Sequence, residues 1–222
     1  MSFFGDAKLG GNEWDEKELR KYAEDMVAVT VPVNMRIEGK QKILDLAVAE
    51  KLLTSAHVIS LGNCGCRERL KKCDAPLDVC LRMGKEAEAT IKSGEGKKVS
   101  VEEALEALKL SHEAGLVHLA FTNKDDERPF VICSCCSCCC HALSSLLRFN
   151  IPAVVESEHV ACQDAEKCGN CGICVGRCQF GARRLVDGKL VFNRAKCFGC
   201  GLCVTTCPNK AISLVERQDG SL

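Results

Sequence analysis

The stretch from Cys168 to Cys207 contains CGNCGICVGRC at residues 168–178 and CFGCGLCVTTC at residues 197–207. Both runs have the spacing C-x2-C-x2-C-x3-C, and Pro208 follows the second run. This spacing is typical of iron–sulfur ligands, and in two-cluster sites the fourth cysteine of each run binds the other cluster. Two adjacent CxxC pairs alone would also suit zinc. A tandem quartet followed by proline is much more specific, so it favours iron–sulfur clusters and leaves zinc as the minor alternative.

The two runs are copies of one unit at an offset of 29 residues. Beyond the cysteines, Gly172 matches Gly201 and Ala182 matches Ala211. Such a repeat predicts two stacked units that share a core, related here by a pseudo-twofold axis. A cluster held by four thiolates has no room for substrate. We therefore expect this segment to carry single electrons rather than to catalyse a reaction.

Residues 162–222 resemble the bacterial-type dicluster ferredoxins, and the resemblance implies two 4Fe-4S clusters with crossed ligation. One departure is Gln179, which stands where that family usually has proline, so the first turn is expected to be less rigid. The implied ligands of one cluster are Cys168, Cys171, Cys174 and Cys207. Those of the other cluster are Cys197, Cys200, Cys203 and Cys178.

The chain has 222 residues and 19 cysteines, enough length for one or two domains. A secreted disulfide scaffold would be shorter and would begin with a signal peptide, which residues 1–8 do not resemble. The sequence has no long apolar run, so we expect no membrane span. The net charge is zero, which gives no reason to expect a nucleic acid partner. Glycine-rich nucleotide-binding motifs are missing, so we expect no NAD or ATP site. The expectation is a cytoplasmic, metal-binding protein of an anaerobic organism, since exposed clusters do not survive oxygen.

The pattern upstream predicts a Cys-rich α/β domain over residues 1–160, followed by the ferredoxin-type domain over residues 161–222, which makes the class α+β. A helical piece is expected to reach residue 92, and residues 93–98 are expected to form a turn-rich connector. A capping box at Ser100–Glu103 then marks the start of the next helix. The other predicted helices are 13–25, 40–54, 101–113 and 142–149. The predicted strands are 27–33, 57–61, 116–121, 129–132 and 151–155, with Pro32 making the first an edge or a strand end.

Ten further cysteines lie before residue 160 in two groups, each after a predicted strand. Loops at strand ends are where sites gather, and six cysteines within eight residues make no sensible core. An iron–sulfur site is the leading interpretation, with zinc and redox disulfides as alternatives. We expect the two groups to form one shared metal site, because neither has a tidy ligand set of its own. The groups are Cys64, Cys66, Cys73 and Cys80, and Cys133, Cys135, Cys136, Cys138, Cys139 and Cys140.

Three more side chains have two interpretations each. His118 lies in an apolar strand and is more often a core histidine than a ligand. His141 directly follows Cys140, so it could bind or hydrogen-bond a cluster, or simply pack. Arg67 follows Cys66 and could offset thiolate charge or bind an anion, or be an exposed structural arginine. For Trp14 and Tyr22, the only tryptophan and tyrosine, packing is the favoured role.

Residues 27–160 also resemble a module of uncharacterised archaeal and bacterial 4Fe-4S dicluster proteins. The resemblance rests on VPVN from Val31, CGCR from Cys64, CDAPLDVCL from Cys73, AGLVH from Ala114 and CSCCSCCC from Cys133. It implies a family but no reaction.

The leading functional hypothesis is an electron-transfer protein that relays single electrons between a redox protein partner and an N-terminal cluster. The alternative is an iron–sulfur oxidoreductase with substrate or disulfide chemistry at that cluster. A third hypothesis is a thiol-based metal carrier or redox sensor. The sequence leaves the catalytic residues, the substrate and the oligomeric state open.

Overall fold

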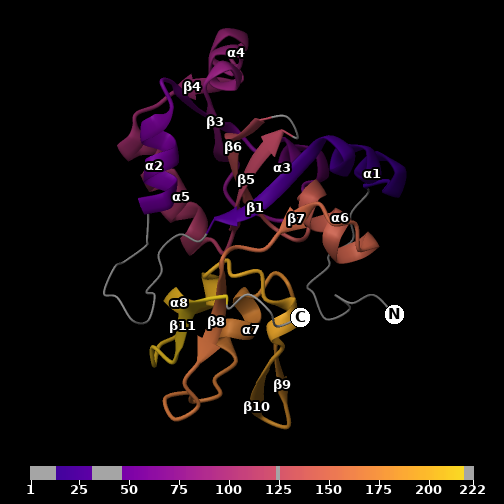
Figure 1. The fold of residues 1–222 in the computed structure, drawn as a ribbon, viewed down its shortest axis with the longest axis vertical. Helices are drawn as coiled ribbons and strands as arrows, with labels where there is room; N and C mark the ends of the chain where they lie inside the picture. The colour runs from indigo at the N-terminus through magenta and orange to yellow at the C-terminus, as the bar shows by residue number, and fades with distance from the viewer. Residues whose placement is uncertain (1–13, 32–46, 124–125, 218–222) are drawn as a thin grey trace.

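The computed structural model describes residues 14–31, 47–123 and 126–217, and Figure 1 shows a larger sheet-based part next to a smaller C-terminal part. The larger part contains a seven-stranded sheet in the order β4-β2-β3-β6-β5-β1-β7. All neighbouring pairs are antiparallel except β1 and β7. The strands are β1 (Met26–Val31), β2 (Ile59–Asn63), β3 (Asp78–Met83), β4 (Gly96–Lys98), β5 (Val117–Asn123), β6 (Asp126–Cys135) and β7 (Val154–Val155).

Helices cover both faces of this sheet because its central strands alternate their side chains between two apolar layers. On one face, α2 (Ala47–Ser55) and α5 (Val101–Glu113) pack with Ile132 of β6. On the other face, α6 (His141–Phe149) packs with Leu119 and Phe121 of β5, and α1 (Glu16–Asp25) lies beside α6. Two further helices, α3 (Gly65–Leu70) and α4 (Lys85–Ser93), flank β3 in the chain. The result is the predicted mixture of helix and sheet.

Local sequence signals explain most of the boundaries. The predicted capping box opens α5, where Ser100 Oγ accepts a hydrogen bond from the Glu103 N–H at 3.2 Å and Glu103 Oε2 accepts one from the Ser100 N–H at 2.8 Å. Asn150 ends α6 in the left-handed conformation, with φ of 53°. Residues 32–46, which include Pro32 and the start of the helix predicted at 40–54, lie outside the described residues.

Two predictions for the middle of the chain are wrong. Residues 78–83, expected to lie in or beside a helical piece, form the interior strand β3, and Cys80 therefore lies on a strand. β3 is buried between β2 and β6, so its side chains lack the alternation that marks a half-buried strand. The expected connector at 93–98 includes the short strand β4, which pairs with β2.

The smaller part contains two antiparallel strand pairs and two short helices. β8 (His159–Gln163) pairs with β11 (Ile212–Glu216), and β9 (Arg183–Val186) pairs with β10 (Lys189–Phe192), both antiparallel. A single 3-10 turn, η1 (Arg194–Lys196), follows β10. The helices α7 (Ile173–Arg177) and α8 (Leu202–Thr205) begin at Gly172 and Gly201, whose φ angles are 76° and 78°. These two glycines occupy equivalent positions in the repeat and adopt the same left-handed conformation, which favours glycine.

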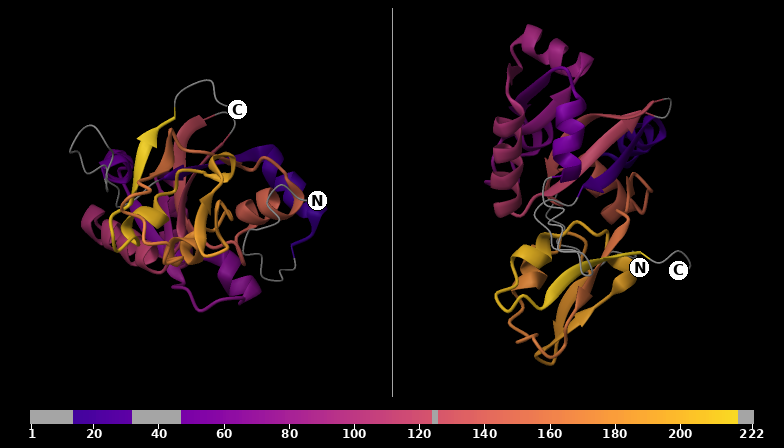
Figure 2. Two further views of the ribbon diagram at one scale, coloured as in Figure 1. Left: turned by 90° about the horizontal axis from the view of Figure 1, so that it is seen from below. Right: turned by 60° about the vertical axis from the view of Figure 1, so that its left-hand side comes forward.

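Direct hydrogen bonds join the two parts, which Figure 2 shows from two further directions. His112 Nε2 lies 2.7 Å from Thr205 Oγ1, and the Thr30 hydroxyl donates to the Phe198 carbonyl at 2.7 Å. Arg177 donates to the carbonyl of His112 at 2.6 Å, next to Gly115. A Cβ atom on Gly115 would lie 2.8 Å from Arg177 Nη1, and the φ of 84° at this residue favours glycine. The chain passes from the larger part to the smaller part between β7 and β8. The division into domains at residue 160 stays a prediction.

Candidate metal centres

Four cysteines line each of two hollows in the smaller part. The first hollow, about 330 Å³ and open to solvent, is lined by the outer set of Cys168, Cys171, Cys174 and Cys207. The second, about 350 Å³, is lined by the inner set of Cys178, Cys197, Cys200 and Cys203. These are the two crossed groups that the ferredoxin resemblance implies. The fold brings the four cysteines of each group together around one hollow. That each group binds a 4Fe-4S cluster remains a prediction.

Backbone amides approach the sulfurs of both repeats in the same way. The Ala182 N–H donates to Cys178 Sγ at 3.3 Å, and the Ala211 N–H donates to Cys207 Sγ at 3.3 Å. Such amide–sulfur bonds tune the potential of an iron–sulfur cluster. The matched alanines of the repeat thus mark matched donors to the two crossed ligands.

The sulfurs of the inner set lie in an environment that disfavours free thiolates. Burial raises the pKa of the Cys200 thiol well above its ordinary value, and burial raises that of Cys203 to about 12 although the Arg183 charge opposes the rise. Arg183 is buried, and its charge faces both Cys203 and Cys174, one from each set. Thiolates in such a place need a metal cation, which releases their protons on binding. The residues therefore fit two iron–sulfur clusters.

Residues 167–212 match the family model of a 4Fe-4S dicluster domain. The match includes all eight cysteines of the outer and inner sets, so the chain carries a C-terminal 4Fe-4S dicluster domain. The search of curated proteins finds no match to the chain. Within the described stretches, no helix has the length and apolar character needed to cross a bilayer.

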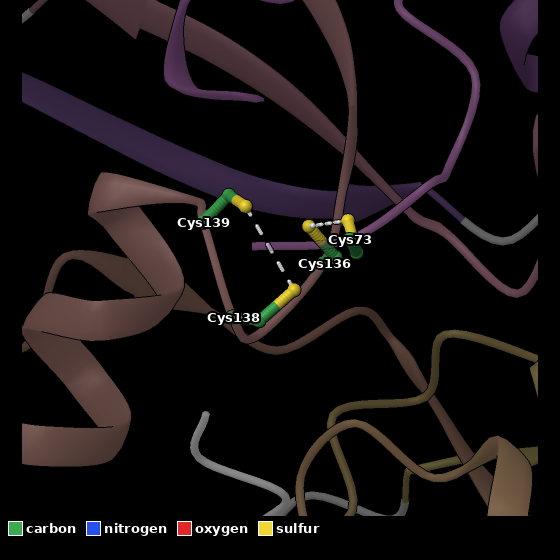
Figure 3. A group of neighbouring side chains, drawn as sticks. All are labelled: Cys73, Cys136, Cys138 and Cys139. Atoms are coloured by element: carbon green, nitrogen blue, oxygen red, sulfur yellow. Dashed lines mark hydrogen bonds between the residues drawn. The ribbon is translucent and has the colours of Figure 1, made fainter. Parts of the chain in front are cut away.

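The ten cysteines before residue 160 form two neighbouring sets. In the four-thiol set, every Sγ lies within 4.8 Å of the other three, and its members are Cys73, Cys136, Cys138 and Cys139. Figure 3 shows these sulfurs converging, with Cys73 Sγ 3.7 Å from Cys136 Sγ and Cys138 Sγ 3.8 Å from Cys139 Sγ. The six-thiol set contains Cys64, Cys66, Cys80, Cys133, Cys135 and Cys140.

Strand pairing assembles the six-thiol set. β3 lies beside β6, which places Cys80 directly opposite Cys133. Hydrogen bonds then connect Cys80 with Cys133, Cys133 with Cys135, and Cys135 with Cys140. At the start of α3, Cys66 hydrogen-bonds to Cys64 and interacts with the charge of Cys140, which closes the group.

The pKa values of these thiols are shifted in opposite directions. Hydrogen bonds from Cys135 and from Cys80 lower the pKa of the Cys133 thiol well below its ordinary value. A hydrogen bond from Cys66 lowers the pKa of Cys64 to about 7, and the donors Cys66 and Cys135 have raised pKa values in return. Crowded thiols of this kind titrate as a group and suit a soft metal, whose binding displaces the shared protons.

Arg67 lies between the two sets. Its side chain is 2% exposed, and Nη1 donates to the Ser134 carbonyl at 3.0 Å and to Cys136 Sγ at 3.7 Å. Its charge also faces Cys64 and Cys135 of the six-thiol set. Arg67 therefore offsets thiolate charge in both sets, as one of its predicted roles required, and the alternative of an exposed arginine is wrong.

The two histidines differ in their surroundings. His118 is 1% exposed, lies 3.0 Å from Ser134 Oγ through Nδ1, and has a pKa lowered to about 3 by burial, so it is the neutral core histidine that the sequence predicted. His141 Nδ1 lies 3.3 Å from Cys66 Sγ. Tyr22 packs on the His141 ring with a centroid distance of 5.0 Å. His141 is therefore placed to orient a sulfur of the six-thiol set.

The structure unites the two predicted cysteine groups but arranges them as two sets, and each set draws members from both groups. Metal binding by either set stays a prediction. Cys162 is exposed and belongs to neither set. Sequence reasoning missed the role of Gln179, whose Oε1 accepts a hydrogen bond from the Ser137 N–H at 3.1 Å and whose Nε2 donates to the Gly115 carbonyl at 3.0 Å. The signal for this role in the sequence was that Gln179 stands where ferredoxins usually have proline.

Proposed function

We propose that the protein relays single electrons from its dicluster domain to an iron–sulfur cluster held by the six-thiol set. The observation that carries this proposal is a shared apolar core. Cys135 and Cys140 of the six-thiol set pack in one cluster of buried side chains with Phe180 and Phe198 of the dicluster domain, and Cys178 and Cys200 of the inner set pack against the same cluster. A dry, packed path between two redox sites supports direct electron exchange.

Two features of this interface keep the path short. The Phe180 and Phe198 rings stack with a centroid distance of 4.5 Å, and each follows an inner-set cysteine in the chain. Gln179, between Cys178 and Phe180, holds the turn of Ser137 by a hydrogen bond. A proline at residue 179 would carry no side-chain amide. It would lose this hydrogen bond and also the one from Gln179 Nε2 to the Gly115 carbonyl. The departure from the ferredoxin pattern thus serves docking within the chain.

The outer set suits contact with a separate redox protein. Cys171 of the outer set is exposed, whereas Cys178 and Cys200 of the inner set pack against the apolar core shared with the sheet-based part. We place the entry or exit of electrons at the outer cluster, and their exchange with the N-terminal cluster at the inner one.

The test is freeze-quench electron paramagnetic resonance on the full anaerobic chain after rapid reduction. The relay predicts that the dicluster signals appear first and that an N-terminal signal follows. Gln179→Pro should keep the iron content and slow the second step about tenfold, as expected for losing roughly 1.4 kcal/mol of docking energy. Pro208→Gln, the equivalent change in the other repeat, is the matched control and should leave the rate unchanged. An N-terminal cluster that never accepts electrons from the dicluster domain overturns the relay.

A second candidate is oxidoreductase chemistry at the six-thiol set. Six thiols exceed the four that a cubane requires, and a hollow of about 200 Å³ lined by Tyr22, Met26, Phe121 and His141 among others opens beside this set. Cyanide added to the reduced protein distinguishes the candidates. A change in the N-terminal spectrum indicates an iron with an open coordination position, and an unchanged spectrum supports the relay alone.

A further inference from the structure

We propose that the four-thiol set of Cys73, Cys136, Cys138 and Cys139 binds a single Zn²⁺ ion, separately from every iron–sulfur cluster of the protein. The proposal does not depend on the electron relay, and its test reads metal content and coordination rather than electron transfer.

The sulfur positions fit one ion. Each Sγ lies within 4.8 Å of the other three, and the two closest pairs are 3.7 and 3.8 Å apart. A tetrahedral ion with metal–sulfur bonds of about 2.3 Å needs sulfurs about 3.8 Å apart. In a cubane each cysteine binds a different iron, so the four sulfurs spread wider. The four-thiol set is therefore close to the ligand shell of one ion and too tight for a 4Fe-4S cluster.

The backbone holds these sulfurs in place from two segments of the chain. Cys73 comes from the extended segment after α3, and the other three come from the turn that joins β6 to α6, as Figure 3 shows. The Cys140 N–H donates to the Cys136 carbonyl at 3.0 Å and closes this turn. Backbone amides of Cys139 and Lys72 donate to Cys136 Sγ and Cys139 Sγ. Outer hydrogen bonds of this kind orient metal ligands.

The charges around the set favour a divalent ion. Four thiolates with one Zn²⁺ leave a net charge of about −2 by formal counting. The buried Arg67 donates to Cys136 Sγ, and the charge of Arg148 faces Cys138. Four thiolates also complete the tetrahedral shell, so no position remains for water or substrate, which is the arrangement of a structural zinc site.

The site anchors the turn on which the other functions depend. Trp14 Nε1 donates to the Cys139 carbonyl at 2.8 Å, which ties α1 to the same turn. Ser137, in the middle of the turn, binds Gln179 of the dicluster domain. Cys135 and Cys140 of the six-thiol set flank the turn on either side. Zinc has no redox chemistry, so it would hold this geometry unchanged while the neighbouring clusters gain and lose electrons.

The decisive experiment is zinc K-edge X-ray absorption of the full chain, purified anaerobically and analysed for metals. The expected result is one zinc per chain with four sulfur neighbours at about 2.3 Å. Absence of zinc, or zinc with fewer than four sulfur neighbours, overturns the proposal, and so does a mononuclear iron in its place.

Paired variants locate the ion. Cys138→Ser with Cys139→Ser should lose the zinc and keep the iron of the dicluster domain. Cys66→Ser with Cys140→Ser, in the six-thiol set, should keep the zinc, and Cys162→Ser, at the exposed cysteine outside both sets, should change neither metal. If the first pair keeps zinc, or the second pair loses it, the assignment to the four-thiol set is wrong. Where a double variant does not fold, the absorption spectrum of the unaltered protein decides.

Discussion

The dicluster domain and the sheet-based part collect their cysteines in different ways. In the dicluster domain, eight cysteines fall between residues 168 and 207 and line hollows of about 330 and 350 Å³. In the sheet-based part, Cys73 and Cys136 lie 63 positions apart in the chain. The four sulfurs of the four-thiol set nevertheless all lie within 4.8 Å of one another. One region forms open cages from local turns, and the other forms a tight group from distant segments.

This difference separates what spacing encodes from what topology encodes. Short loops with left-handed glycines at Gly172 and Gly201 direct nearby cysteines toward a common centre. The N-terminal sets depend instead on the strand order that places β3 beside β6. A motif therefore identifies the first kind of site, and only the assembled fold identifies the second.

Removing one thiol from each cage should give the largest effect. Cys174→Ala and Cys203→Ala should each cost about four irons, one cubane, because a cluster with three protein ligands is retained poorly. Iron analysis and electron paramagnetic resonance of the full chain provide the measurement. The N-terminal metals should persist in both variants, and loss of those metals would show that the two regions are not independent.

Arg67→Gln should act on the sheet-based part alone. The change removes a buried positive charge that faces both N-terminal sets, and breaking a buried charge interaction costs about 3–5 kcal/mol. We expect loss of zinc and N-terminal iron, measured by metal analysis, with the iron of the dicluster domain unchanged. The matched control is Arg69→Gln on the same helix, where the arginine is half-exposed and pairs with Glu18 at 3.0 Å. Equal metal loss in the two variants would contradict the role of Arg67.

Gly115→Ala should weaken the contact between the two regions by about 2 kcal/mol, through left-handed strain and a clash with Arg177. Gly94→Ala is the control, because Gly94 has φ of 78° and open space around it. Hydrogen exchange at the C-terminal end of α5 measures the difference. Exchange at the end of α5 that is no faster in Gly115→Ala than in Gly94→Ala would contradict the weakening of this contact.

The smallest expected effect is a pH dependence at this contact. Burial, together with the Arg177 charge, lowers the pKa of His112 to about 4 from an ordinary value near 6.5. The folded state therefore holds His112 neutral, and its stability is complete above pH 6.5 and falls as the pH drops toward 4. At pH 6 the cost is about 1 kcal/mol. Urea unfolding at pH 7.5 and 6 should show a loss about 1 kcal/mol smaller in His112→Gln than in the natural protein, because the buried His118 still contributes its own loss in both. An equal loss in both would exclude His112 as a source.

The sequence predicted the local features of the fold and few of the long-range ones. The capping box at Ser100 and the repeat of Gly172 and Gly201 each rest on neighbouring residues, and the structure contains them. The strand that carries Cys80 was missed because a strand buried on both faces has no alternation to recognise. The division of ten thiols into two sets was also out of reach, since it follows from which strands pair. Arg67 was ambiguous for the same reason, because its burial depends on segments 67 positions away.

The crossed lining of the two hollows has a consequence for the synthesis of the protein. Cys178 is synthesised before the other three cysteines that line the inner hollow. The outer hollow is incomplete until Cys207 has been added to the chain. By contrast, Cys140 is the last thiol that the N-terminal sets need. Since N-terminal regions fold first as a chain emerges from the ribosome, the zinc and the N-terminal cluster that we propose would be loaded while the repeat is still being translated. Both clusters of the dicluster domain can then be completed only at the end, against a surface that is already in place.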